Sequence, residues 1–244
     1  MAHHIQGQRT QRLERLEAQM MTLDEIAQKH GTDKSSLNHN YTAIYEPLLE
    51  PLRDKPITLL ELGWGGHEDP DSGGNSARTW AEYFTHPGAE IIVVELESKN
   101  VRPEDDERIT LWQGSQDDQA MIDQIAAVYG PFDVIIDDAS HLSSKTIRSF
   151  ELLFRHVTPG GIYAVEDTHA SYHEHYYGSM EANEDPEKRR RDGEFTMMQF
   201  FQRLTDEVNY RGRTELDLFP SRYAWNVPVE SIAFYFNMLV AKRR

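Results

Sequence analysis

The sequence contains no cysteine among its 244 residues. This absence excludes disulfide bonds, cysteine-based zinc sites and thiol catalysis. No apolar run approaches the roughly 18 residues that a membrane-spanning helix requires. The N-terminal stretch MAHHIQGQRTQRLERLE also lacks the apolar core of a secretory signal. We therefore expect a cytoplasmic protein without a membrane segment.

Positive charge is also scarce, because 25 Lys and Arg residues stand against 41 Asp and Glu residues, a formal charge of −16. A field of this sign repels phosphate backbones, so nucleic acid is not expected as a partner. It favours a neutral or cationic ligand and the binding of a metal ion. The hydrophobic fraction of 39% is typical of a globular protein.

Five short apolar runs end in polar or charged residues, and they cover 57–62, 90–96, 108–114, 132–138 and 161–167. Segments of helix length separate them, at about 75–86, 117–129 and 143–157. Runs that are apolar on both faces and alternate with helices are typical of a doubly wound parallel sheet. After a helix over 194–210, one more strand is predicted over 231–242.

The segment that precedes these runs is predicted to be helical. Thr22 and Glu25 fit a capping box that begins a short helix ending at Gly31, and another helix follows it to about Arg53. We predict a helical extension over residues 1–55 and a main domain over 56–244. A polar helix over 8–20 carries an apolar stripe that could dock on a second subunit, which makes a homodimer the expected assembly.

The turn after the first run, Glu61-Leu-Gly-Trp-Gly-Gly66, is a candidate cofactor site, because glycines let the backbone approach a ligand closely. Such a turn could hold NAD or S-adenosylmethionine. The Glu61 carboxylate suits a cationic amino group or sulfonium better than a pyrophosphate. The turn lacks a clean GxGxxG before a helix, and the acidic loop 67–75 would repel a pyrophosphate. The pattern favours S-adenosylmethionine over NAD, although an NAD-dependent dehydrogenase stays an alternative.

Other strand ends offer groups for the rest of this cofactor, since ligands of such sheets bind at the carboxyl ends of strands. Glu95 ends the second run and could accept hydrogen bonds from both ribose hydroxyls. Gln116 and Asp117 follow the third run, where the adenine is expected. The predicted cofactor-binding residues are Glu61, Gly63, Ser76, Glu95, Gln116, Asp117 and Asp137.

Three carboxylates follow the fourth and fifth runs, namely Asp138, Glu166 and Asp167. They would repel one another unless a cation lay between them. Oxygen ligands indicate Mg²⁺, Ca²⁺ or Mn²⁺ rather than zinc. A cation can lower the pKa of a hydroxyl, and the imidazole of His141 is the candidate base that removes the proton. The competing interpretation is a helix N-cap at Asp138 and solvated strand ends at the other two.

A second group, His169, His173 and His175, has a spacing that could bind zinc. The surrounding stretch, residues 170–178, reads more like a loop over the substrate. Its tyrosines could line the site of a sugar or aromatic acceptor.

Two stretches resemble the signature of the metal-dependent sugar O-methyltransferases, the family of the macrocin and mycinamicin enzymes. They are IIDDASH at 135–141 and SFELLFRHVTPGGIYAVEDTHASY at 149–172. An upstream element, GTDKSSLNHNY at 31–41, resembles the same family. The resemblance covers about residues 22–242. It implies a class I methyltransferase fold, with a Rossmann-like, mostly parallel seven-stranded sheet, an antiparallel last strand and helices on both faces.

The resemblance also implies an activity, methylation of a hydroxyl of a hexose that is free or part of a glycoside or oligosaccharide. S-adenosylmethionine and Mg²⁺ are the implied cofactors. Asp138, Glu166 and Asp167 correspond to the family's metal ligands, and His141 to its base. The family's short members, which lack a large N-terminal domain, point to the 1-hydroxyl of methylmannose oligosaccharides as one acceptor.

Two other functions stay open at this point. Catechol and phenol O-methyltransferases share the carboxylate pattern but have Lys where this chain has His141. A non-catalytic S-adenosylmethionine-binding accessory protein is the other possibility. The acidic loop after Gly66 departs from the family pattern, which leaves open whether Gly73, Gly74 or Ser76 contacts the cofactor.

Overall fold

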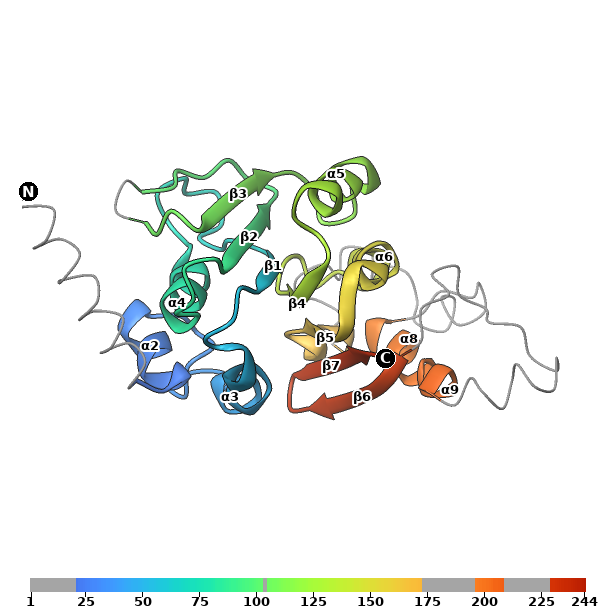
Figure 1. Cartoon of the computed structure of the whole chain (residues 1–244). Helices are drawn as coiled ribbons and strands as arrows, with labels where there is room; N and C mark the ends of the chain where they lie inside the picture. Colours follow the sequence, from blue (N-terminus) through green and yellow to red (C-terminus); the bar gives the residue numbers. More distant parts are fainter. Residues whose placement is uncertain (1–20, 103–104, 173–195, 209–228) are drawn as a thin grey trace, which may run out of the picture.

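The computed structural model describes residues 21–102, 105–172, 196–208 and 229–244 (Figure 1). Its centre is a seven-stranded sheet in the order β3-β2-β1-β4-β5-β7-β6. The pairs within β1 to β5 are parallel, whereas β7 runs antiparallel to both β5 and β6. The predicted mostly parallel sheet with an antiparallel last strand is therefore confirmed.

The strands are β1 Thr58–Leu62, β2 Glu90–Glu95, β3 Ile109–Gln113, β4 Phe132–Asp137, β5 Val157–Val165, β6 Val229–Tyr235 and β7 Met238–Arg243. β5 begins four residues before the apolar run that predicted it. The early pair Phe132↔Val157 is followed by a register shift, which absorbs the Pro159-Gly160-Gly161 stretch. A β-bulge or irregularity of this kind lets a strand continue through residues that would otherwise suggest a turn.

The prediction of one strand over 231–242 is wrong, because two strands form a hairpin there. β6 pairs with β7 through Tyr235↔Met238, and the turn between them is Phe236-Asn237. Asn237 adopts a left-handed backbone with φ 57°, a conformation that asparagine tolerates better than most residues. The turn was missed because Asn237 alone interrupts the apolar run 232–241, which contains no Gly or Pro.

The α-helices are α2 Leu23–His30, α3 Thr42–Leu49, α4 Asn75–Tyr83, α5 Gln119–Tyr129, α6 Ser143–Leu153, α8 Met197–Arg203 and α9 Thr205–Val208. Short 3₁₀ helices are η1 Glu50–Leu52, η2 Phe154–His156 and η3 Thr168–Tyr172. The single helix predicted over 194–210 is divided into α8 and α9 within its described part. The helix predicted over 8–20 lies outside the described residues, so the homodimer that depended on it stays a prediction.

The helix ends follow the local sequence. Thr22 and Glu25 form the predicted capping box of α2, and Gly31 ends the helix in a left-handed conformation with φ 71°. At α5, the Asp118 carboxylate accepts hydrogen bonds from the backbone N–H groups of Ala120 at 2.9 Å and Met121 at 3.2 Å. These bonds satisfy donors that a helix cannot pair within its own first turn.

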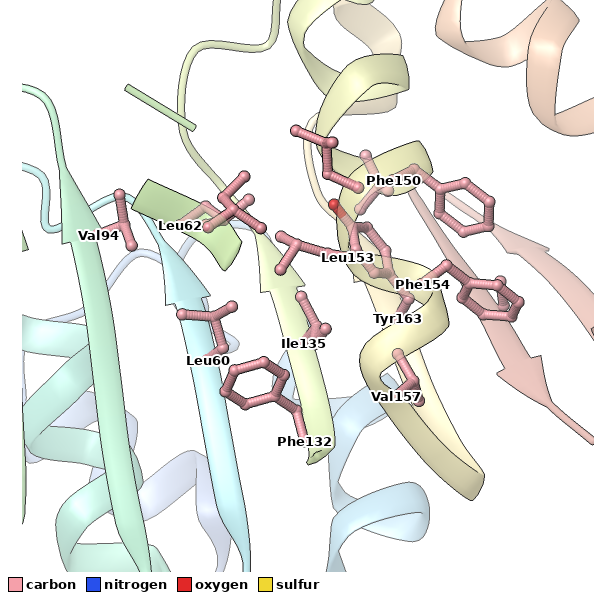
Figure 2. Close-up of a cluster of buried hydrophobic side chains, with 14 of the residues drawn as sticks. Leu60, Leu62, Val94, Phe132, Ile135, Phe150, Leu153, Phe154, Val157 and Tyr163 are labelled. Atoms are coloured by element: carbon pink, nitrogen blue, oxygen red, sulfur yellow. The ribbon is translucent and has the colours of Figure 1, made fainter. Parts of the chain in front are cut away.

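Helices cover both faces of the sheet. Alternate residues of the strands point to opposite sides, so Leu60, Ile135 and Tyr163 join one buried cluster with residues of α5, α6 and α8 (Figure 2). The neighbouring strand positions, such as Leu59 and Ile136, join a second cluster with α2, α3 and α4. The helices that precede β1 are thus packed into the same core as the sheet. This packing fixes the α2–α3 loop close to the ends of the strands.

Among the described helices, none combines the length and the apolar character needed to cross a membrane.

The Asp118 cap gives a stability prediction. Asp118→Ala removes the acceptor for two backbone N–H groups and should lower the free energy of unfolding by about 1 kcal/mol. Asp123→Ala, at an exposed position within the same helix, is the matched control and should change it by less than about 0.5 kcal/mol. Urea denaturation of both variants measures the difference. Equal effects would show that the cap contributes nothing.

Candidate active site

The carboxyl ends of β1, β4 and β5 meet at one edge of the sheet, where backbone hydrogen bonds join the residues that follow the strands. The N–H of Asp138 donates to the carbonyl of Leu62 at 3.0 Å, and the N–H of Glu166 donates to that of Asp137 at 3.0 Å. Glu61, Asp138 and Glu166 therefore occupy adjacent positions although the chain separates them widely. This is the edge at which ligands bind in open α/β sheets.

A candidate cation site lies here, formed by Asp138, His141 and Asp167, whose ligand atoms are all within 4.8 Å of one another. Nε2 of His141 is 3.6 Å from Oδ2 of Asp167 and 4.0 Å from Oδ1 of Asp138. His141 and Asp167 both adopt left-handed backbones, with φ 54° and 50°. Such conformations cost energy in residues other than glycine and concentrate at functional sites.

Glu166, the third predicted metal ligand, is not one of these three residues, and its side chain is buried. Its Oε1 accepts a hydrogen bond from the Tyr45 hydroxyl at 2.6 Å, and its Oε2 accepts one from Nζ of Lys34 at 2.7 Å. Burial raises the pKa of Glu166 well above its usual range, against the opposing effect of Lys34. These two bonds leave other lone pairs of Glu166 unused, but the group of ligand atoms described above contains His141 and not Glu166, so Glu166 as a metal ligand stays a prediction.

Lys34 is the main functional residue that the sequence argument missed. Its side chain is 2% exposed, and its Nζ contacts Asp138, lies 2.7 Å from Glu166 and lies 3.8 Å from Oε1 of Glu61. Burial alone would lower the pKa of Lys34, but attraction by these carboxylates raises it well above the usual value. The ammonium group of Lys34 therefore supplies part of the positive charge that the carboxylates at the strand ends require. The resemblance of residues 31–41 to the family was the one indication of this role.

Two tyrosines that flank or belong to α3 hold the same carboxylates. The Tyr41 hydroxyl donates to Oδ1 of Asp167 at 2.6 Å, as Tyr45 does to Glu166. Burial raises the pKa of both tyrosines, so they remain protonated donors at neutral pH. The ring of His39 stacks on that of Tyr41 at 5.2 Å between centroids. The sequence pattern did not show these contacts because the partners are more than a hundred residues apart.

A cavity of about 240 Å³ lies beside the cation site. Its walls are the loop 31–34, the glycine turn 63–66, residues 73, 75 and 76, and Asp138. Gly63 has φ 107°, and a Cβ atom there would collide with the carbonyl oxygen of Asp138. Only glycine permits this close approach of the ends of β1 and β4.

Glu61 presents an unsatisfied oxygen close to this cavity. Its side chain is fully buried, and its Oε2 accepts a hydrogen bond from the Ser76 hydroxyl at 2.9 Å. Its Oε1 has no hydrogen-bond partner among the described residues. Burial raises the pKa of Glu61 to about 7. A buried acceptor in this state is suited to a cationic donor from a ligand.

Glu95, predicted to bind the ribose, lies against the same glycine turn. Its Oε2 accepts hydrogen bonds from the N–H groups of Trp64 at 2.9 Å and Gly65 at 3.3 Å, and its Oε1 accepts one from Glu97 at 3.1 Å. A wider, open hollow of about 790 Å³ continues from Gly66 past Glu97. The backbone contacts of Glu95 thus reach Trp64 and Gly65 of the cavity wall and Glu97 of the open hollow.

Of the predicted cofactor residues, Gly63 and Ser76 line the cavity, whereas Glu61, Glu95, Gln116, Asp117 and Asp137 do not. Gln116 donates to Oδ1 of Asp137 at 3.1 Å and accepts from the N–H of Ser140 at 3.0 Å. Burial raises the pKa of Asp137 to about 7. Asp117 lies 3.7 Å from Nζ of Lys145. Gln116 and Asp137 thus support the loop that carries Asp138 and His141, and direct contact of these three residues with a cofactor stays a prediction.

The histidine cluster considered for zinc falls mostly outside the described residues. His169 is described, and its Nδ1 lies 3.9 Å from Oδ1 of Asp167. His173 and His175 lie outside, as do Tyr176 and Tyr177 of the predicted substrate loop. Tyr172, the described member of that loop, has 69% of its surface exposed.

The strand order and the site at the carboxyl edge define a class I methyltransferase fold, and comparison with solved structures agrees. An O-methyltransferase from Bacillus cereus in complex with SAH shares the fold at 16% identity, with a TM-score of 0.53, over 91% of this chain and 90% of that chain. The MycE methyltransferase of the mycinamycin pathway, in complex with Mg, SAH and mycinamycin VI, is 29% identical with a TM-score of 0.75. That alignment covers 91% of this chain and 53% of MycE.

Curated relatives are sugar O-methyltransferases, which confirms the predicted resemblance. The 8-demethyl-8-alpha-L-rhamnosyl tetracenomycin-C 2'-O-methyltransferase of Streptomyces olivaceus is 34% identical over 185 residues, 76% of this chain and 45% of the relative. The mycinamicin VI 2''-O-methyltransferase of Micromonospora griseorubida is 36% identical over 162 residues, 66% of this chain and 40% of the relative. The chain thus spans less than half the length of the curated relatives it matches. No family model matches the chain.

Gly63 gives a prediction about the cavity. Gly63→Ala introduces both a strained φ and a collision with Asp138, so it should lower stability and weaken binding of S-adenosylhomocysteine. Gly65→Ala is the control, because it has a similar strained φ of 77° but no atom within 4 Å of the new Cβ. We expect Gly63→Ala to lose at least about 1 kcal/mol more of unfolding free energy than the control. Thermal unfolding and calorimetry would test this, and equal losses would contradict the collision.

Proposed function

We propose that the chain transfers a methyl group from S-adenosylmethionine to a hydroxyl of a hexose in a glycosylated natural product, with Mg²⁺ as cofactor. The observation that supports this most directly is that Asp138 belongs both to the candidate cation site and to the wall of the cavity. A methyl donor in the cavity and a hydroxyl at the cation site would therefore lie next to each other. The relatives' action on rhamnosyl and mycinamicin sugars favours a sugar as acceptor.

The cavity residues fit the methionine end of the donor. Ser76 lines the cavity and donates to Oε2 of Glu61, whose Oε1 lies 3.8 Å from Nζ of Lys34, has no hydrogen-bond partner among the described residues and can accept a hydrogen bond from a cationic amino group. Gly63, Gly65 and Gly66 line the cavity, so their backbone groups can contact the ligand. Glu95 accepts three backbone hydrogen bonds, which leaves about one of its lone-pair sites for a ribose hydroxyl.

The carboxylates fit Mg²⁺, because Asp138, Glu166 and Asp167 supply oxygen ligands of the kind that this ion prefers. When bound, Mg²⁺ supplies Lewis acidity that lowers the pKa of the acceptor hydroxyl. Lys34, Tyr41 and Tyr45 orient the carboxylates through the hydrogen bonds described above. The lone pairs of these carboxylates that do not accept those hydrogen bonds are the proposed ligands of the cation.

His141 is the proposed general base. The acceptor oxygen forms a bond to the methyl carbon while the carbon–sulfur bond breaks, and the hydroxyl proton passes to Nε2 of His141. The products are a methyl ether and S-adenosylhomocysteine, and the proton then leaves His141 to solvent. Oδ2 of Asp167, 3.6 Å from Nε2, can stabilise the imidazolium that forms. No covalent enzyme intermediate is required, so orientation of the two substrates supplies much of the rate.

The base assignment is tested by His141→Ala, which should lower kcat by at least about 10²-fold and leave the affinity for S-adenosylhomocysteine unchanged. The reason is that His141 does not line the cavity. His86→Ala, after α4 at the opposite edge of the sheet, is the control and should keep wild-type kcat. Steady-state kinetics and calorimetry measure the two quantities. Full turnover in His141→Ala would remove it as the base.

The acceptor is tested with labelled S-adenosylmethionine and a panel of a rhamnosylated polyketide, a methylmannose oligosaccharide and a catechol, each with Mg²⁺ and with EDTA. We expect labelling of the rhamnosylated compound that EDTA abolishes. Labelling of the methylmannose oligosaccharide alone would favour the narrower acceptor expected for short family members. Labelling of the catechol alone would contradict the sugar assignment, and binding without any transfer would favour an accessory protein.

A further inference from the structure

One ammonium group joins the cavity to the candidate cation site. Lys34 belongs to the loop that lines the cavity, yet its Nζ contacts Asp138 and lies 2.7 Å from Oε2 of Glu166. The same Nζ lies 3.8 Å from Oε1 of Glu61, the unpartnered oxygen on the donor side. A lysine ammonium has three donors. Two of them serve the cation side, and Glu61 is the nearest remaining carboxylate.

The contacts of Lys34 determine how Asp138 is oriented. Oδ2 of Asp138 accepts the hydrogen bond from Lys34, while its Oδ1 lies 4.0 Å from Nε2 of His141. The two oxygens of the Asp138 carboxylate therefore have different contacts, Oδ2 with Lys34 and Oδ1 with His141. Without the ammonium, Oδ2 of Asp138 would lose this hydrogen bond, and the carboxylate would keep only the longer contact of Oδ1 with His141 among the side-chain contacts described above.

The backbone that carries Lys34 is fixed on both sides. The carbonyl of Lys34 accepts a hydrogen bond from the N–H of Thr42 at 3.0 Å, at the start of α3. The carbonyl of Gly31 accepts one from Nδ2 of Asn75 at 3.2 Å, and Asn75 itself lines the cavity. A ligand that fills the cavity thus contacts both this loop and one of its anchors.

We propose that Lys34 is a positioning residue that couples binding of S-adenosylmethionine to binding of the divalent cation. This inference rests on the function proposed above. A ligand in the cavity contacts the loop 31–34 and adds to its two anchors, and this further restrains the ammonium that holds Asp138 and Glu166 in the arrangement that the cation requires. Coupling of two binding equilibria is reciprocal, so the cation must raise affinity for the donor by the same factor.

A simpler role for Lys34 makes a different prediction. If the ammonium only balances the negative charge, its removal leaves the carboxylates more attractive to a cation. Lys34→Met would then bind Mg²⁺ more tightly, and any coupling between the two ligands would persist. A positioning role predicts loss of the coupling itself.

The experiment is a thermodynamic cycle by titration calorimetry. Mg²⁺ affinity is measured with and without saturating S-adenosylhomocysteine, and affinity for S-adenosylhomocysteine with and without Mg²⁺. In the wild type we expect each ligand to raise the affinity of the other by about fivefold or more. In Lys34→Met this factor should fall to near one. Tyr45→Phe is the control, because it removes a hydrogen bond to Glu166 without altering the cavity wall; it should weaken Mg²⁺ binding and keep the coupling.

The outcomes separate this inference from the proposed function. If the wild type fails to bind Mg²⁺ or S-adenosylhomocysteine, the proposed function is contradicted. If both bind without coupling, or if Lys34→Met couples them as the wild type does, the role of Lys34 is overturned. Circular dichroism checks that the variant folds. If Lys34→Met does not fold, Lys34→Gln is measured instead. Its amide keeps a hydrogen-bond donor but cannot reach both carboxylates, so this variant is also expected to lose the coupling.

Discussion

The arrangement of the site depends on the ion cluster that Lys34 forms with Glu61, Asp138 and Glu166. A charge withdrawn from water costs several kcal/mol unless partners of opposite sign surround it. The buried ammonium therefore requires the carboxylates, and the carboxylates require the ammonium. These ion pairs hold the α2–α3 loop against the ends of β1, β4 and β5. The loop forms one wall of the cavity there.

The parallel sheet and the segment before β1 contribute different groups to the site. The parallel sheet brings the acids together, because β1, β4 and β5 are neighbours whose carboxyl ends share one edge. The helices before β1 bring the groups that direct those acids, namely Lys34, Tyr41 and Tyr45. Strand ends alone would present several carboxylates of undefined orientation. The preceding segment gives each a fixed donor and so a defined set of free lone pairs.

Periodicity predicted the parallel strands, the helices between them and the capping box of α2, because these depend on local sequence. The β6–β7 hairpin was missed, since its Phe236-Asn237 turn has no strong local mark. The burial of Lys34 was not predicted for a different reason. A lysine in a polar loop normally points to solvent, and only the tertiary arrangement shows that it is buried. Likewise, Gln116 ends a strand region as predicted but turns toward Asp137 rather than the cavity.

The charges of the site suit both of the proposed ligands. Glu61, Asp138, Glu166 and Asp167 carry four negative charges when ionised, against the single positive charge of Lys34. Burial is the main cause of the raised pKa values of Glu61 and Glu166, and the nearby charge of Asp138 adds to it while Lys34 opposes it. With the proposed ligands bound, Mg²⁺ adds two positive charges and S-adenosylmethionine adds one net charge, which restores balance. Methyl transfer removes the sulfonium charge, so the product S-adenosylhomocysteine leaves one negative charge uncompensated. Electrostatics therefore favours the methyl donor over its product in this site.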